Sequence, residues 1–259
     1  MKEWRVEVGG TTLRLAEEKP YADRDNKDVP VDTLLFDPTY TVAAATGLNV
    51  WEGAWIFVDY LKGPFGQAVS GKRVVELGAG TGISGLCTAA AGGHVLMTDV
   101  ASIASSILQF NLDRNTSTGE GKEGNGEGWH GSVPVGAQGG SAAVMALDWT
   151  ASLESQSILN NPLETDFVIA TDTVWLANLV DHFVGTVRKI LGGPRQPVCL
   201  LAFQDRYDAG TDVFAALQTL TRKFNELQCT VQEVPLSLPQ PPTLYHPDKK
   251  HILQITLNK

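Results

Sequence analysis

The stretch Val74–Gly85, VVELGAGTGISG, constrains the fold more than any other part of this 259-residue sequence. A short β-branched run leads directly into glycines, and the residues that follow place Ile83, Leu86 and Ala90 on one helical face. Glycines at such a point permit a tight turn and let a ligand approach the backbone at a helix N-terminus. The stretch therefore predicts a strand–turn–helix unit that carries a small-molecule site.

Apolar runs of strand length recur after this unit, and amphipathic helical patterns separate them. The runs show little alternation of apolar and polar residues, which is typical of parallel strands covered on both faces. The last run, HILQITL, does alternate, and no helix separates it from TVQEV. The predicted fold is therefore an α/β sheet of seven strands whose last strand is antiparallel.

The predicted order of strands and helices also indicates where the N-terminal segment and two of the loops lie. WRVEVGGTTLRLAEE predicts a small N-terminal β-hairpin, so we expect residues 1–46 to form a hairpin and loop extension and residues 47–259 to form one domain. The glycine-rich stretch at about 116–141 is expected to be a flexible insertion at the edge away from the chemistry. The loop near Pro239–Pro247 follows a parallel strand, so Tyr245 and His246 either border a substrate pocket or form a plain solvated connection.

Composition excludes several classes of function. The formal net charge of −9 and the lack of clustered Lys and Arg argue against a nucleic-acid partner. The three cysteines are odd in number and lack a C-x-x-C spacing, so neither a disulfide framework nor a metal site is expected. No run of residues has the length and apolar character of a membrane span, and a cytoplasmic location is expected.

The glycines fit two kinds of cofactor site. Gly80–Gly85 matches the G-x-G-x-x-G pattern of dinucleotide folds, whereas Gly78–Gly82 matches the G-x-G-x-G of S-adenosylmethionine sites. Asp99, about 20 residues further on, can accept hydrogen bonds from ribose hydroxyls in either case. Glu76 discriminates, because an acid at this turn would repel a pyrophosphate but stabilise an ammonium and a sulfonium. The charge pattern therefore favours the methyl donor.

Seven blocks occur in an order that resembles a known family. They are NVWEGAWIFVDYL, GKRVVELGAGTGISGL, GGHVLMTD, LQFNLDRN, ALDW, DFVIATDTVW and LLAFQDRY, and they cover about residues 47–225. In order and approximate spacing they resemble the seven-β-strand methyltransferases of family 16, a group that includes many protein-lysine methyltransferases. The resemblance implies a class I methyltransferase, Rossmann-like fold with S-adenosylmethionine as cofactor.

The resemblance also implies roles for individual residues around the cofactor. It places Trp51 near the cofactor, Asp99 on the ribose and Trp149 against the adenine, with backbone contacts from Thr171; the methionyl side is lined by Gly78, Ala79 and Gly80. Two of these have structural alternatives, since Trp149 could be an ordinary core residue and Trp51 a helix-packing residue.

Asp172 and Trp175, in the block TDTVW, are the predicted catalytic pair. Asp172 would orient the incoming amine, and Trp175 would form one wall of the acceptor site through its π face. In the lysine methyltransferases that the block resembles, the pattern is usually D-x-x-Y, so Trp175 replaces a tyrosine and exchanges a hydroxyl for an N–H donor. The alternative for Asp172 is a cap on the helix that follows it.

These observations predict an S-adenosylmethionine-dependent methyltransferase that acts on a protein side-chain nitrogen, with lysine as the first choice. Two alternatives stay open: a small-molecule N-methyltransferase of the same fold, and a catalytically silent module that binds the cofactor. The expected partner is a protein substrate, and we expect a monomer in the cytoplasm, with the nucleus as the other possible compartment.

Overall fold

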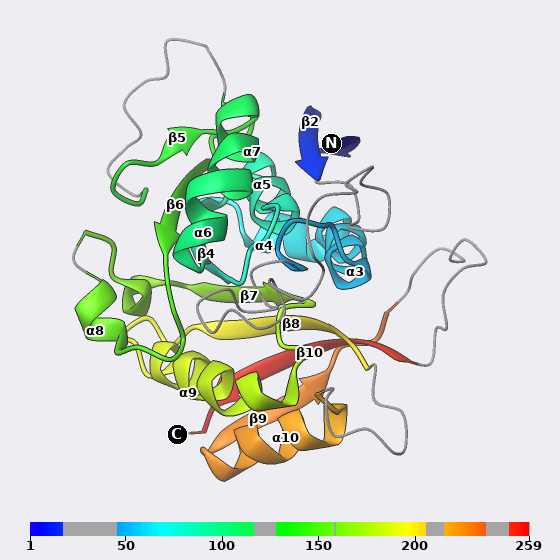
Figure 1. Ribbon diagram of the computed structural model, residues 1–259. Helices are drawn as coiled ribbons and strands as arrows, with labels where there is room; N and C mark the ends of the chain where they lie inside the picture. The colour runs from blue at the N-terminus through cyan, green and yellow to red at the C-terminus, as the bar shows by residue number, and fades with distance from the viewer. Residues whose placement is uncertain (18–45, 117–127, 158, 206–214, 237–248, 259) are drawn as a thin grey trace, which may run out of the picture.

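The computed structural model describes residues 1–17, 46–116, 128–157, 159–205, 215–236 and 249–258. Its centre is a sheet of eight strands in the order β5-β6-β4-β3-β7-β8-β10-β9 (Figure 1). The strands are β3 (Arg73–Leu77), β4 (His94–Asp99), β5 (Val133–Pro134), β6 (Ser141–Ala146), β7 (Phe167–Thr171), β8 (Val198–Gln204), β9 (Cys229–Glu233) and β10 (Lys250–Leu257).

The pairing of the strands confirms the reversed last strand and corrects the strand number. Strands β6, β4, β3, β7 and β8 pair in parallel, and β10 lies antiparallel between β8 and β9. The eighth strand, β5, is only two residues long and pairs with the start of β6. It was missed because a two-residue strand has no periodicity that a sequence pattern could reveal.

Helices cover both faces of the sheet, as the sequence predicted. The helices that precede β5 in the sequence cover one face and form the first group. The helices that follow β6 cover the other face and form the second group (Figure 1). Adjacent strand residues such as Val74 and Val75 are both fully buried, but they belong to the two different cores. The first group is α3 (Glu52–Tyr60), α4 (Gly66–Ala68), α5 (Ile83–Ala90), α6 (Ala101–Ile103) and α7 (Gln109–Arg114); the second is α8 (Leu153–Gln156), α9 (Val180–Leu191) and α10 (Leu217–Glu226).

Short irregular helical segments join some of these helices. Two π-helical segments, Leu61–Phe65 and Ala104–Leu108, connect α3 to α4 and α6 to α7, and two 3-10 turns, Pro162–Glu164 and Ala177–Leu179, precede β7 and α9. Of the helices in the described ranges, none combines the length and the apolar character that crossing a membrane requires.

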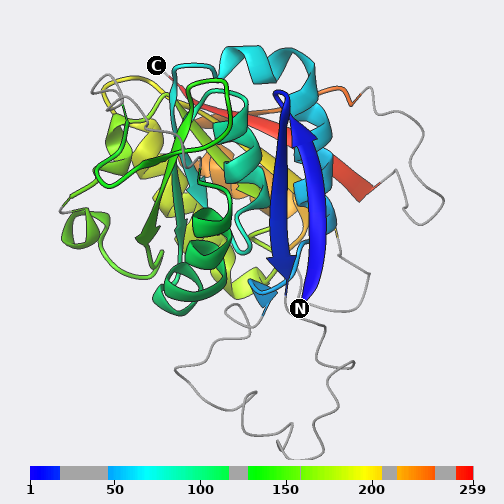
Figure 2. The ribbon, with the colours of Figure 1, turned by 90° about the horizontal axis from the view of Figure 1, so that it is seen from above.

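The predicted N-terminal hairpin is formed by β1 (Lys2–Val8) and β2 (Thr11–Glu17). It lies beside the helices of the first face, where β2 contacts α5 and α7 (Figure 2). Asn111 of α7 holds it there: its side-chain oxygen accepts the N–H of Ala16 at 2.8 Å, and its amide donates to the carbonyls of Ala16 and Thr81. One buried amide therefore ties the hairpin to the glycine turn.

Replacing Asn111 with alanine is expected to lower the free energy of unfolding by about 2 to 4 kcal/mol, because three buried backbone groups lose their partner. The matched control is Asn115→Ala, since Asn115 also makes three hydrogen bonds but lies nearer solvent, where water can replace them. Urea unfolding measures both variants. Equal losses for the two would show that burial is not what makes the Asn111 amide important.

Part of the glycine-rich stretch is packed, which corrects the expectation of a flexible insertion over 116–141. Trp129 is buried, its indole N–H donates to the carbonyl of His94 at 2.8 Å, and the Arg73 guanidinium lies 4.0 Å from its ring centre. Val135 is fully buried as well. These isolated apolar residues anchor the segment, and the glycines around them hid that signal in the sequence.

Several predictions fall outside the described residues. The loop part of the N-terminal extension, residues 18–45, residues 117–127 of the glycine-rich stretch, and both Tyr245 and His246 are among them. The division of the chain at residues 46 and 47 therefore stays a prediction.

The three cysteine thiols are all buried. Burial raises the pKa of the thiol in Cys87, Cys199 and Cys229, so the reactive thiolate is disfavoured. These side chains serve as small apolar core residues.

Candidate active site

The glycine turn between β3 and α5 is built on left-handed backbone conformations. Gly78, Gly80 and Gly82 have φ values of 65°, 55° and 81°, a region that L side chains rarely adopt. Gly82 is the N-cap of α5, and its N–H donates to the carbonyl of Ala79 at 2.8 Å. The alternating glycines therefore produce the tight strand-to-helix turn that the sequence predicted.

Neighbouring backbone and side chains approach this turn closely. A Cβ atom at Gly78 would overlap the hydroxyl of Thr173 and would lie 3.2 Å from the Trp149 ring. A Cβ atom at Gly80 would lie 3.1 Å from the carbonyl oxygen of Gly47. The turn is thus enclosed by the loop after β7, by the loop after β6, and by the segment that leads into α3.

Asp99, at the end of β4, is joined to the turn. Its Oδ2 accepts the N–H of Gly80 at 2.7 Å, and its Oδ1 accepts the N–H of Val100 at 2.7 Å. Burial raises the pKa of the carboxyl to about 6, although both N–H donors favour the charged form. Each oxygen keeps a further lone pair for another donor. The structure therefore places Asp99 beside the glycines, where a hydroxyl-bearing ligand could meet it.

Glu76 lies inside the β3–α5 unit. Its carboxyl is fully buried, and neither oxygen has a hydrogen-bond partner in the described part of the chain. A Cβ atom at Gly85 would overlap its Oε2, so the third glycine of the apparent dinucleotide pattern makes room for this acid. Burial, and then the negative charge of Asp99, raise the pKa of Glu76 well above its ordinary value. Such a carboxyl is stabilised by any cation brought to the turn.

Asp172 caps a helix, but a different helix from the one that follows it, which corrects that alternative. Its Oδ2 accepts the N–H of Gly53 in the first turn of α3 at 3.1 Å, across 119 residues of sequence. Its Oδ1 accepts the N–H of Gln204 at the end of β8 at 3.4 Å. The backbone at Asp172 has a φ of 55°, which is strained for most residues but less so for Asp and Asn.

The contacts of Asp172 depend on a glycine that the sequence did not single out as functional. A Cβ atom at Gly53 would lie 2.8 Å from the Cβ of Asp172, so only glycine allows α3 to begin so close to the end of β7. The available signal was a glycine inside an otherwise apolar helical pattern. Thr173 and Gly47 were missed in the same way, because their contacts with the glycine turn are long-range.

The aromatic candidates occupy different surroundings. The Trp149 ring packs edge-on against Phe183 at 5.3 Å between ring centres, in addition to its approach to Gly78. Trp175 is half-buried in the loop after β7, where its carbonyl accepts the N–H of Ala215. Trp51 is 40% exposed, and its indole N–H donates to the carbonyl of Thr46 at 2.8 Å. The structure therefore brings Trp149 to the glycine turn and places Trp51 at the start of α3.

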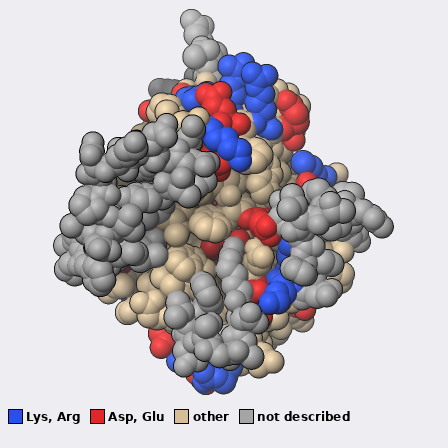
Figure 3. Space-filling view, turned by 45° about the vertical axis from the view of Figure 1, so that its right-hand side comes forward, with Lys and Arg blue, Asp and Glu red and all other residues tan. Residues whose placement is uncertain are grey.

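Thr171 ends β7 next to these groups. Its hydroxyl lies 3.0 Å from the hydroxyl of Ser84 in α5, which joins the end of β7 to the helix after the glycine turn. The ends of β3, β4 and β7 thus converge at one edge of the sheet, as expected for a ligand site in an open parallel sheet. Figure 3 brings forward the side of Figure 1 at which the arrows of β7 and β8 end; mainly uncharged surface and some acidic side chains are visible near its centre.

Comparisons with known proteins show which family the sequence matches. A family model described as lysine methyltransferase matches residues 38–220. The chain is 33% identical over 168 residues to EEF1A lysine methyltransferase 3 of Mus musculus, a match that spans 64% of this chain and 59% of the mouse protein. It is 28% identical over 170 residues to protein N-lysine methyltransferase METTL21A of Mus musculus, across 65% of this chain and 66% of that protein.

Solved structures share the fold at low sequence identity. Magnesium protoporphyrin IX methyltransferase from Synechocystis, solved with bound SAH, has a TM-score of 0.50 and 14% identity, over 79% of this chain and 82% of that one. A putative methyltransferase, SMU.776, complexed with SAH, has a TM-score of 0.53 and 10% identity, over 98% of this chain and 56% of that one. These likenesses concern the sheet and its helices.

The extent of the match decides what the comparisons establish. The chain spans about three fifths of the length of the EEF1A relative, so the activity of that whole protein does not transfer by similarity alone. The family model, by contrast, covers more than half of the chain and includes the glycine turn, Asp99 and the loop after β7. The chain therefore belongs to the lysine methyltransferase family that this model describes.

Proposed function

We propose that this protein is an S-adenosylmethionine-dependent methyltransferase that methylates a lysine side chain of a protein substrate. The observation that carries the proposal is the convergence of the glycine turn, Asp99 and the Asp172 loop at one edge of the sheet. Membership of the lysine methyltransferase family supports the same reaction.

The residues at the turn fit a cationic nucleoside cofactor. Asp99 offers carboxylate oxygens to ribose hydroxyls, Trp149 offers a ring to the adenine, and the backbone of Gly78, Ala79 and Gly80 receives the methionyl part. The buried Glu76 carboxyl, for which the described residues offer no hydrogen-bond partner, favours the approach of a positive charge and disfavours a pyrophosphate. S-adenosylmethionine supplies an electrophilic methyl group on a sulfonium.

The acceptor side is formed by the loop after β7. Asp172 accepts N–H groups of α3 and β8, and in this proposal its carboxylate also orients the incoming amine. Trp175, in the same loop, forms a wall whose π face favours a cation and lacks the hydroxyl of a tyrosine. Thr171 supplies backbone contacts and Trp51 borders the cofactor from the start of α3. The chain's contribution is then mainly the positioning of two reactants, an effect worth about 7 to 11 kcal/mol when the orientation is good.

The proposal is tested by incubating the pure protein with radiolabelled S-adenosylmethionine and a cell extract. A labelled protein band whose label is found on lysine is expected, and Asp99→Ala should remove it. Label only in low-mass products would select a small-molecule N-methyltransferase instead. Donor binding in a calorimeter without transfer to any fraction would identify a silent cofactor-binding module.

Cofactor affinity is expected to fall as the pH drops below about 6, because the carboxyl of Asp99 has its pKa there and only the ionised form accepts two hydroxyl protons. Because burial raises the pKa of Asp99, ionising this carboxyl lowers the free energy of unfolding as the pH rises from the ordinary pKa of an aspartate toward about 6. Hydrogen-bond donors of a bound ligand offset that loss. We expect a loss of about tenfold in affinity per pH unit on the acid side.

Calorimetric titration of wild type and Asp99→Asn across this range measures the effect. The asparagine variant should bind weakly with no inflection near pH 6, and an inflection that persists in the variant would assign the titration to another group.

We further propose that the protein acts as a monomer in the cytoplasm, with the nucleus as the other compartment, on the basis of its charge and reduced cysteines.

A further inference from the structure

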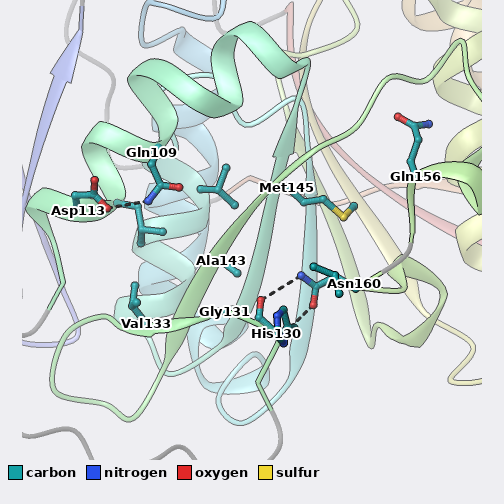
Figure 4. A pocket seen from close by; sticks show the side chains of 12 residues that line it. Gln109, Asp113, His130, Gly131, Val133, Ala143, Met145, Gln156 and Asn160 are labelled. Atoms are coloured by element: carbon teal, nitrogen blue, oxygen red, sulfur yellow. Dashed lines mark hydrogen bonds between the residues drawn. The ribbon is translucent and has the colours of Figure 1, made fainter.

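A groove separate from the glycine turn runs beside strand β6. It has a volume of about 350 Å³. Gln109, Leu112 and Asp113 of α7 form one wall, and β6 from Ala143 to Met145 forms the floor. The other wall is formed by His130, Gly131, Val133, Gln156, Leu159 and Asn160 (Figure 4). The two segments of the second wall are joined, because the Asn160 side chain accepts the backbone N–H of His130 at 2.7 Å and donates to its carbonyl.

The floor of the groove is an open edge of the sheet. Strand β4 pairs with β6 along its whole length, from Ser141 to Ala146, but β5 pairs only with Ser141 and Ala142. Ser141 and Leu147 donate their N–H groups to the β4 side. Since successive peptide groups alternate between the two sides of a strand, the N–H and C=O of Val144 point away from β4 and into the groove. In the described part of the chain, no strand covers this position.

The side chains around the open edge favour a basic and partly apolar occupant. Among the described residues that line the groove, Asp113 is the only carboxylate, and there is no Lys or Arg. The Gln109 amide donates to Asp113 Oδ1 at 2.8 Å and holds the carboxylate in place. Leu159 stands 71% exposed at the rim, where it offers an apolar contact to a side chain that lies in the groove.

We propose that this groove binds an extended basic segment of a partner protein, which adds to β6 as a further strand at Val144 and directs a Lys or Arg side chain to Asp113. Strand addition supplies main-chain hydrogen bonds, and alternate side chains of the bound segment then contact the two walls of the groove. An apolar side chain of the segment covers Leu159. The site is independent of methyl transfer, and it lies on residues that the cofactor site does not use.

A short blocked peptide of alternating lysine and valine is the probe, and the glutamate–valine peptide is its control. We expect the basic peptide to bind the full chain in a calorimeter and to slow hydrogen exchange of the Val144 amide, and the acidic peptide to do neither. Asp113→Asn should weaken binding about tenfold, which corresponds to 1.4 kcal/mol. Asp59→Asn, at an exposed acid of α3, is the matched control and should bind as wild type does.

Val144→Pro tests the strand addition itself, because it removes an N–H that faces the groove and leaves the bonds to β4 in place. It should abolish binding, whereas Val144→Thr, which keeps that N–H, should not. Equal binding of both peptides, protection of amides elsewhere only, or no binding of the basic peptide would each overturn the proposal. Self-association of the free chain that protects Val144 would identify a second copy as the occupant and overturn it as well.

Discussion

Gly78→Ala is expected to abolish cofactor binding and to lower the free energy of unfolding by about 3 kcal/mol or more. The added Cβ would overlap the Thr173 hydroxyl, lie 2.8 Å from the Thr173 Cβ and press on the Trp149 ring, at a backbone φ of 65°. Displacing Thr173 and Trp149 would deform both loops that enclose the turn. Urea unfolding and calorimetric titration with S-adenosylmethionine measure the two effects.

Gly71→Ala separates backbone strain from crowding in this experiment. Gly71 has a similar φ of 68°, but a Cβ there meets no atom within 4 Å. We expect it to cost about 1 to 2 kcal/mol and to leave cofactor binding unchanged. If the two alanine variants lost the same stability and both bound the cofactor, the close approach of Thr173 and Trp149 would not explain why glycine is required at position 78.

Asp172→Asn is expected to lower kcat for methyl transfer by about a hundredfold or more while the chain stays folded. Asparagine tolerates the positive φ and keeps one oxygen that can accept the Gly53 N–H, but it lacks the charge that orients an amine. Asp172→Ala should lose activity and also about 2 to 4 kcal/mol of stability, because the N–H groups of Gly53 and Gln204 lose their acceptor.

Asp166 provides the matched control at the opposite end of β7. Its Oδ2 accepts the backbone N–H of Arg73 at 2.9 Å, so it also joins two elements through a carboxylate. Asp166→Asn should change stability by a similar amount and leave kcat unaffected. Full activity of Asp172→Asn would restrict Asp172 to its structural role and would move the acceptor site away from it.

Features that arise from interactions between residues close in the sequence were predicted, and features that arise from long-range contacts were not. The glycine turn, the parallel strands and the reversed last strand were predicted because each has a local cause: a positive φ, burial on both faces, or alternation of apolar and polar residues. The position of Asp99 at the end of the next strand was predicted as well, whereas its hydrogen bond with the Gly80 N–H, 19 residues away, was found only in the structure. Strand β5 and the packing of Trp129 lack such a local signal.

The sequence by itself determined the class of fold, the glycine turn between β3 and α5, and the acid at the end of β4. Only the tertiary structure decided that Asp172 caps α3 across 119 residues, that Glu76 is buried against Gly85, and that β6 keeps an open edge beside Asp113. Periodicity and turn chemistry act within one element, whereas these features arise where distant elements meet. Their energies depend on burial and on contacts that no short stretch of the chain contains.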